Sequence, residues 1–177
     1  RERKMYTVDT LCASLGQGLL VYLAAKERDA GKSIEQVRDW VEENKLHICH
    51  QFTVDDLHFL KRGGRISATT AVMGSMLQIK PVLHVDNEGH LTNIAKARGR
   101  QASLKALVDK MEKTAIDPAN QGVFISHGDC LEDAQTVEKM VKERFGVKEV
   151  YINYVGPVIG AHSGPGTLAL FYVGSER

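Results

Sequence analysis

The chain has 177 residues, 43% of them hydrophobic and 25% charged, enough for one sizeable domain or for one small domain and part of another. Its 23 basic and 22 acidic residues leave a formal net charge of +1, so no overall field favours nucleic acid or an anionic membrane. Three cysteines without CxxC spacing, Cys12, Cys49 and Cys130, indicate a reducing compartment, and we predict a cytoplasmic location. No apolar run approaches the roughly 20 residues that span a bilayer, so stable membrane insertion is not expected.

The first block of the chain, residues 1–46, is expected to hold one strand and two helices. Residues 5–9 have the composition of a strand, residues 14–31 carry leucines at helical spacing, and Ser33 with Gln36 forms a capping box for a second helix. One strand is too little sheet to bury two helices. The block is therefore predicted to pack on a segment outside this sequence.

The second block, residues 47–177, is richer in strands, and two βαβ-like units and a hairpin around residues 86–90 predict both parallel and antiparallel pairing. Strands are predicted at 50–54, 79–85, 91–97, 123–126, 150–152 and 168–173, and helices at 101–114 and 131–145, with a helical turn capped by Asp55 and a helix of small residues after Arg65. The predicted fold is α/β: a two-layer domain with a mixed sheet of about six strands, preceded by the remnant of a Rossmann-like three-layer domain.

Two short glycine patterns suggest nucleotide binding but lack its context. GKS at residues 31–33 resembles the end of a P-loop, yet position 26 is Lys rather than Gly, and a predicted helix rather than a strand precedes it. GQG at residues 16–18 lacks the third glycine of a dinucleotide-binding turn. We interpret both as helix and turn positions and predict no cofactor.

Three potential metal ligands lie close together in the sequence: His47, Cys49 and His50. Alternation along a strand places Cys49 on the opposite face from His50, and no second ligand cluster has matching spacing, so no metal site is predicted. The SHGDC segment at residues 126–130 lies between a predicted strand and a predicted helix, where α/β proteins often place functional groups. Asp129 in this segment also fits an ordinary helix start.

The KRGGRIS loop at residues 61–67 is a candidate binding element. Gly63 and Gly64 allow backbone conformations and close approaches that other residues exclude. The guanidinium groups of Arg62 and Arg65 are forked donors suited to a carboxylate or a phosphate. A solvated basic turn explains the same residues equally well.

The IGAHSGPGT segment at residues 159–167 is a second candidate. His162 lies between Gly160 and Gly164, and a neutral imidazole can donate to a ligand oxygen while a neighbour orients its other nitrogen. A loop histidine satisfied by nearby carbonyl groups is the equally simple alternative.

Five segments together resemble the DegV family of bacterial fatty-acid-binding proteins. They are VDTLCASLGQGLLV, FTVDDLHFLKRGGRIS, IKPVLHVDNEGHL, KARGRQASL and GPVIGAHSGPGTLALFY, and they match in order and spacing from about Val8 to Tyr172. The resemblance implies that a long-chain fatty acid is buried between two α/β domains, with its carboxylate in a polar pocket at the mouth of a tunnel.

The resemblance also implies roles for individual residues. Arg65 and His162 would belong to the network that binds the carboxylate, and Arg98 in KARGRQ would be part of a docking surface for a fatty acid kinase that phosphorylates the bound acid. An Arg and a His suit this role because a carboxylate removed from water is costly unless it is paired. Apolar residues of the helix after Arg65 are expected to line the tunnel: Val72, Met73, Met76 and Leu77.

Family members begin with a further Rossmann-like segment whose Ser and Thr residues also bind the carboxylate, and this sequence does not contain it. The resemblance therefore implies that the chain corresponds to the back portion of such a protein, with the missing N-terminal part as a partner of the site. Residues 1–46 would be the end of the first domain and residues 47–177 the second domain.

We therefore predict a lipid-binding carrier rather than an enzyme, and two alternatives stay open. One is a hydrolase or acyl transferase with His162 as general base and Ser163, Ser14 or Cys12 as nucleophile, although the chain has no G-x-S-x-G elbow. The other is a structural domain that binds no ligand.

Overall fold

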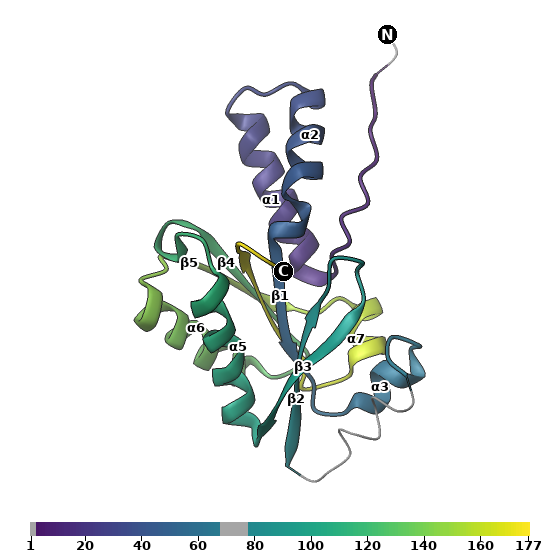
Figure 1. The fold of residues 1–177 in the computed structure, drawn as a ribbon, viewed down its shortest axis with the longest axis vertical. Coiled ribbons are helices and arrows are strands. Elements are labelled where there is room, and N and C mark those ends of the chain that lie inside the picture. The colour runs from purple at the N-terminus through teal and green to yellow at the C-terminus, as the bar shows by residue number, and fades with distance from the viewer. Residues whose placement is uncertain (1–2, 68–77) are drawn as a thin grey trace.

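The structure, a computed structural model, describes residues 3–67 and 78–177. Its centre is a six-stranded mixed sheet with the strand order β3-β2-β1-β6-β4-β5 (Figure 1). The strands are β1 (Ile48–Thr53), β2 (Ile79–Val85), β3 (Leu91–Arg98), β4 (Gly122–His127), β5 (Glu149–Tyr154) and β6 (Leu168–Val173). The helices are α1 (Ser14–Asp29), α2 (Ile34–Asn44), α3 (Leu57–Arg62), α5 (Arg100–Thr114), α6 (Leu131–Phe145) and α7 (Pro157–Ser163), with short 3₁₀ turns at Lys45–His47 and Pro118–Asn120. The predicted α/β fold with a mixed sheet of six strands is confirmed.

Strand β1 lies in the middle of the sheet and is buried along its whole length. It pairs antiparallel with both β2 and β6, and β6 pairs antiparallel with β4. The parallel strands β4 and β5 are joined by α6, as a βαβ unit requires. The connection β3–α5–β4 differs from a simple unit, because β2, β1 and β6 lie between its two strands.

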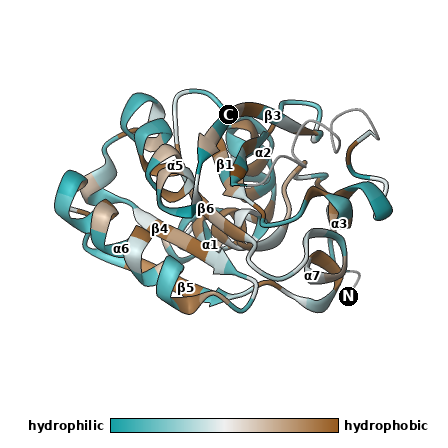
Figure 2. Ribbon diagram, turned by 90° about the horizontal axis from the view of Figure 1, so that it is seen from below, coloured by the Kyte–Doolittle hydropathy of each residue, from teal (hydrophilic) through white to brown (hydrophobic). Residues whose placement is uncertain are grey.

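Each face of the sheet has its own hydrophobic core. On one face α5 and α6 pack residues such as Leu107 and Val137 against Cys49, and on the other face α1 packs Leu19 against Phe52. Hydrophobic residues concentrate on the strands, while α5 and α6 turn hydrophilic residues outward (Figure 2). The predicted alternation along β1 is confirmed, since Cys49 and its neighbour His50 lie on opposite faces.

Helices α1 and α2 project beyond the end of the sheet as an antiparallel pair (Figure 1). The predicted capping box of α2 is confirmed: Ser33 Oγ accepts from the amide of Gln36 at 3.3 Å, and Gln36 Oε1 accepts from the amide of Ser33 at 2.8 Å. Among residues 3–67 and 78–177, no helix combines the length and apolarity that crossing a bilayer requires.

The expected strand at residues 5–9 is wrong. This segment pairs with no strand in the described part of the chain, and side chains hold it instead. Lys4 forms an ion pair with Glu35 of α2 at 2.6 Å, and Lys45 donates to the carbonyl of Asp9 at 3.0 Å. Composition favoured a strand, but a strand also needs a partner with which to share its backbone hydrogen bonds.

Two local predictions around the candidate loops are also corrected. Asp56 rather than Asp55 caps α3, because its carboxylate accepts from the amide of His58 at 2.8 Å. Residues 159–163 of the second candidate segment are helical rather than a loop, because they belong to α7, which has Pro157 at its first position. The predicted helix of small residues after Arg65, with Val72, Met73, Met76 and Leu77, lies outside the described residues.

Candidate functional site

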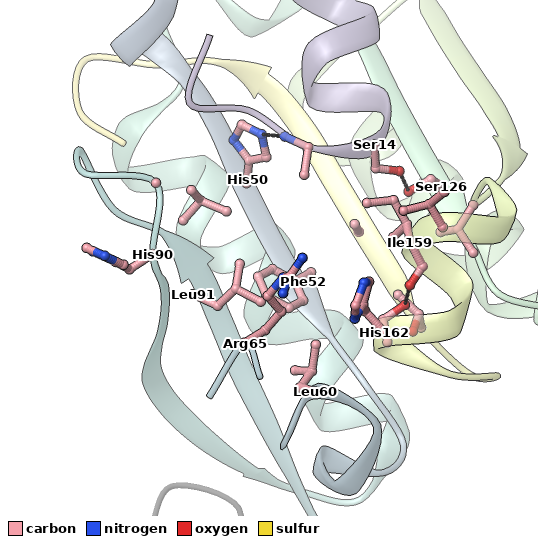
Figure 3. Close-up of a pocket in the computed structure, with 18 of the residues that line it drawn as sticks. Ser14, His50, Phe52, Leu60, Arg65, His90, Leu91, Ser126, Ile159 and His162 are labelled. Carbon is pink, nitrogen blue, oxygen red and sulfur yellow. Dashed lines mark hydrogen bonds between the residues drawn. The ribbon is translucent and has the colours of Figure 1, made fainter. Parts of the chain in front are cut away.

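A cavity of about 370 Å³ opens on the face of the sheet that carries α1 (Figure 3). It lies between the tip of the β2–β3 hairpin and α7, and the first residues of α1 border it (Figure 3). Its walls are largely apolar and come from four strands and α3: Phe52, Leu60, Val85, Leu91, Ala169 and Phe171. Such a lining suits a ligand with a substantial apolar part.

The structure brings Arg65 and His162 to this same cavity from distant segments (Figure 3). Arg65 follows the C-terminus of α3, and its exposed guanidinium donates to the carbonyl of Gly63 at 2.8 Å. His162 lies in the last turn of α7 and is half-buried. Because α3 packs against α7, a cation and an imidazole from distant segments line the same largely apolar cavity.

The imidazole of His162 lies directly against the backbone of Gly63. A methyl group on Gly63 would overlap Nδ1 of His162, so only glycine leaves room for the ring in this position. Nδ1 is buried and has no hydrogen-bond partner within the described residues. The amides of Gly63, Gly64 and Arg65 already donate to carbonyls of α3, so this turn has no donor to offer it.

The other glycines named from the sequence differ in what they permit. Gly164 has a φ of +80°, and a side chain there would press on the ring of Phe59, so α3 and α7 approach each other closely at this point. Gly64 lines the cavity beside Arg65, with a φ of +69°. Gly160 lies within α7, where a side chain would make only ordinary contact with Val155.

Six polar residues that the sequence did not predict as ligand contacts also line the cavity: Ser14, His50, His90, Ser126, Ser163 and Thr167. His50 is 2% exposed, donates from Nδ1 to a carbonyl of its own strand and accepts at Nε2 from the amide of Ala13. Burial lowers the pKa of His50 to about 3, so the ring is neutral. The absence of a side chain on Gly16 makes space for it. Alternation along β1 could have placed His50 with Phe52 on this wall.

The hydrolase alternative needs a nucleophile beside His162. The hydroxyl of Ser163 donates to a carbonyl of its own helix at 2.9 Å, and that of Ser14 donates to another serine at 3.0 Å. Cys12 accepts from Arg177 at 2.9 Å, and burial raises the pKa of its thiol. Within the described part of the chain, none of the three is hydrogen-bonded to His162, so the geometry gives this alternative no support.

Arg98 lies apart from the cavity. It is the last residue of β3, an edge strand of the sheet, and its side chain is exposed. It therefore belongs to the outer surface rather than to the cavity lining.

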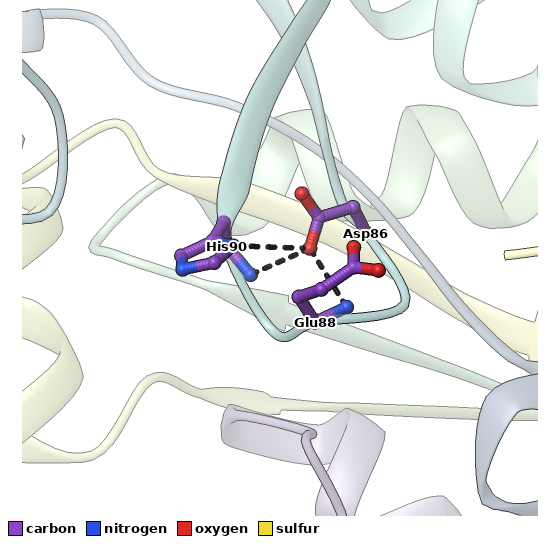
Figure 4. A group of neighbouring side chains, drawn as sticks. All are labelled: Asp86, Glu88 and His90. Carbon is purple, nitrogen blue, oxygen red and sulfur yellow. Dashed lines mark hydrogen bonds and ion pairs between the residues drawn. The ribbon is translucent and has the colours of Figure 1, made fainter.

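One cluster of potential metal ligands occurs at the tip of the β2–β3 hairpin, where Asp86, Glu88 and His90 place ligand atoms within 4.8 Å of one another (Figure 4). The Asp86 carboxylate accepts from the amides of Glu88 at 3.0 Å and His90 at 2.8 Å. The backbone amide of His90 is the main cause that lowers the pKa of Asp86. These hydrogen bonds are typical of a hairpin turn, and they explain why the three side chains lie close together.

The chain is similar to known proteins over nearly its whole length. A family model described as "Uncharacterised protein, DegV family" matches residues 1–175. A DegV domain-containing protein from Clostridium perfringens is 54% identical over 170 residues, which cover 96% of this chain and 58% of the relative. The chain therefore spans about three fifths of the length of this relative.

Solved structures show the same fold. A DegV family protein from Thermus thermophilus, described as binding fatty acid, is 31% identical, with a TM-score of 0.79 over 94% of this chain and 60% of that one. The fatty acid kinase B3 protein of Streptococcus pneumoniae, solved loaded with linoleic acid, has a TM-score of 0.88 over 96% of this chain and 60% of that one; at 22% identity it supports the fold alone. Family match, sequence identity and fold agree over nearly the whole length: the chain belongs to the DegV family.

Proposed function

We propose that the protein binds a long-chain fatty acid in the cavity beside α7, with the carboxylate held by Arg65 and His162. The observation that carries the proposal is that these two side chains line one cavity whose other walls are largely apolar. An amphiphile with an anionic head matches this distribution of polar and apolar groups. The fatty-acid-binding relative from Thermus thermophilus supports the same ligand class.

The two parts of the ligand contribute differently to binding. Each buried CH₂ group of the acyl chain contributes about 0.8 kcal/mol, so the apolar walls supply most of the affinity. Removing the carboxylate from water costs free energy unless it is paired and hydrogen-bonded. Arg65 and His162 would offset this cost. Nδ1 of His162 faces Gly63 and has no partner among the described residues, so Nε2 is the ring nitrogen that would donate to a carboxylate oxygen.

We further propose that residues 1–46 belong to a first domain that continues outside this sequence, with residues 47–177 as the second domain and the acid between the two. Apolar side chains on α1 and α2 are uncovered in the described structure: Val21 is 60% exposed and Ile34 is 48% exposed. The Clostridium perfringens relative is longer than the stretch matched here, which supports a further segment that packs on these helices.

The protein in this proposal is a carrier, not an enzyme, and a fatty acid kinase phosphorylates the carboxylate while the acid stays bound. This assignment follows the Streptococcus pneumoniae neighbour, which is named a fatty acid kinase B3 protein and shares its fold with this chain. Exposed Arg98 on the edge strand β3 would contact the kinase, outside the cavity that holds the acid.

Native mass spectrometry with lipid extraction tests the ligand directly. The protein is produced in bacteria from its complete gene, as wild type and as Arg65→Ala and His162→Ala variants. Arg62→Ala is the matched control, because Arg62 stacks on Phe59 and is absent from the cavity lining. We expect a co-purifying fatty acid in the wild type and the control and its depletion in the other two variants. A wild type that is empty and takes up no added fatty acid would overturn the proposal and favour a structural domain.

A further inference from the structure

The cavity contains a second polar feature besides Arg65 and His162. Ser14, at the start of α1, donates its hydroxyl hydrogen bond to Ser126 of β4 at 3.0 Å (Figure 3). Both residues line the cavity, and Ser126 is completely buried. The hydrogen-bonded pair thus lies in the wall of a largely apolar cavity.

The Ser14–Ser126 pair can donate one further hydrogen bond. A hydroxyl can donate once and accept twice. With Ser14 as the donor, the proton of Ser126 has no acceptor among the residues that the structure describes. The imidazole of His50 does not supply one, because its Nε2 already accepts from the amide of Ala13 and its Nδ1 donates to a carbonyl of β1. A buried donor without an acceptor is unfavourable, so a ligand oxygen at this point would be stabilised.

The backbone at Ser14 is a separate sign that the pair is held in place. Ser14 has a φ of +52°, in the left-handed region that residues other than glycine rarely adopt. Such strain persists only where the surrounding structure imposes it, and it often marks a binding site. Here His50 fixes the preceding amide of Ala13, and the strained residue presents its hydroxyl to Ser126.

We infer that the Ser14–Ser126 pair is a specificity-determining contact that selects an acyl chain carrying a hydrogen-bonding oxygen, a hydroxy or oxo group, over the unsubstituted chain. The inference rests on the proposed function, because it takes Arg65 and His162 as the head-group contacts. The ligand oxygen accepts from Ser126, and its apolar neighbours keep water from competing for that bond. The position of the substituent is set by the length of chain between the head-group contacts and the pair.

Competition binding against a fluorescent fatty acid tests the inference on the protein produced from its complete gene. The ligands are stearic acid and a positional series of hydroxystearic acids. In the wild type, one isomer in the series is expected to bind about tenfold more tightly than stearic acid. This is the gain in affinity that one additional buried hydrogen bond provides. In Ser126→Ala this preference should vanish, while stearic acid binds as tightly as before or more tightly, because the unpaired donor is gone.

The matched control is Ser103→Ala, which removes another completely buried serine whose hydroxyl bonds a carbonyl of α5, on the far face of the sheet. It should keep the preference. If every member of the series binds no better than stearic acid in the wild type, or if Ser126→Ala weakens all ligands alike, the inference is wrong while the proposed function stands. If neither stearic acid nor any hydroxystearic acid binds the wild type, both fail.

Discussion

Gly63 has no side chain, and the imidazole of His162 occupies the space that a side chain at position 63 would fill. Its φ is −73°, so alanine is compatible with the backbone and Gly63→Ala changes little besides this contact. We expect the added methyl group to displace His162 and to weaken fatty acid binding by about tenfold or more, the loss of a hydrogen bond to a charged group. Competition binding against a fluorescent fatty acid measures this.

The control for this prediction is Gly156→Ala. Gly156 precedes α7 at a φ of −65°, and no atom beyond its chain neighbours lies within 4 Å of the position of an added Cβ. Its variant should bind like the wild type. Equal affinity of Gly63→Ala and the wild type would show that His162 is not held by this contact.

His50 makes the stability of the protein depend on pH. Its folded pKa of about 3 lies below the value of about 6.5 for an unfolded histidine, so the unfolded state binds more protons between these two values. Stability is therefore fully present above about pH 6.5 and is lost as the pH falls toward 3. From pH 7 to pH 5 this loss amounts to about 2 kcal/mol. Urea denaturation of the wild type and His50→Gln should show a smaller pH dependence in the variant, and identical dependence would contradict the assignment.

At the scale of elements, the sequence predicted regular segments far better than the site between them. Alternation and helical spacing are local signals, and they located β2, β3, α5 and α6 within a few residues. The helix α7 was missed because its glycines have low helix propensity, and its stability comes from packing on α3. The meeting of Arg65 and His162 depends on that same packing, which no local pattern contains. Family resemblance, rather than spacing, linked the two residues.

The capping box of α2 gives a prediction at this scale. Ser33→Ala removes the acceptor for the amide of Gln36 and should destabilise the protein by about 1 kcal/mol, whereas Ser33→Asp keeps a cap and should lose much less. Urea denaturation measures the change, and hydrogen exchange should locate the added opening in α2. If Ser33→Asp loses as much as Ser33→Ala, the stabilisation does not come from the cap.

In the whole molecule, the cavity includes only the first residue of the edge strand β3, Leu91, and Arg98 at the other end of that strand does not line it. The cavity uses β1, β6 and the tips of β2 and β3 on the α1 face, whereas β3 itself is an edge strand with exposed residues such as Lys96 and Arg98. A carrier that presents its ligand to a kinase benefits when different residues bind the ligand and the kinase, because the kinase can then bind and dissociate without release of the ligand. Under the proposed function, fatty acid binding and phosphorylation of the bound acid are therefore expected to be separable by mutation.

Arg98→Ala tests that separation. The side chain does not line the cavity, so the variant should retain fatty acid as the wild type does in native mass spectrometry. A charge at the rim of an interface mainly changes the association rate and its salt dependence, so phosphorylation of the bound acid by the kinase should slow by about three- to tenfold at low ionic strength and less at high salt. Lys139→Ala on α6, an exposed cation on the far face of the sheet, is the control and should leave the rate unchanged. A normal rate in Arg98→Ala would place the kinase elsewhere on the surface, and loss of the fatty acid from this variant would show that the edge strand and the cavity are not independent.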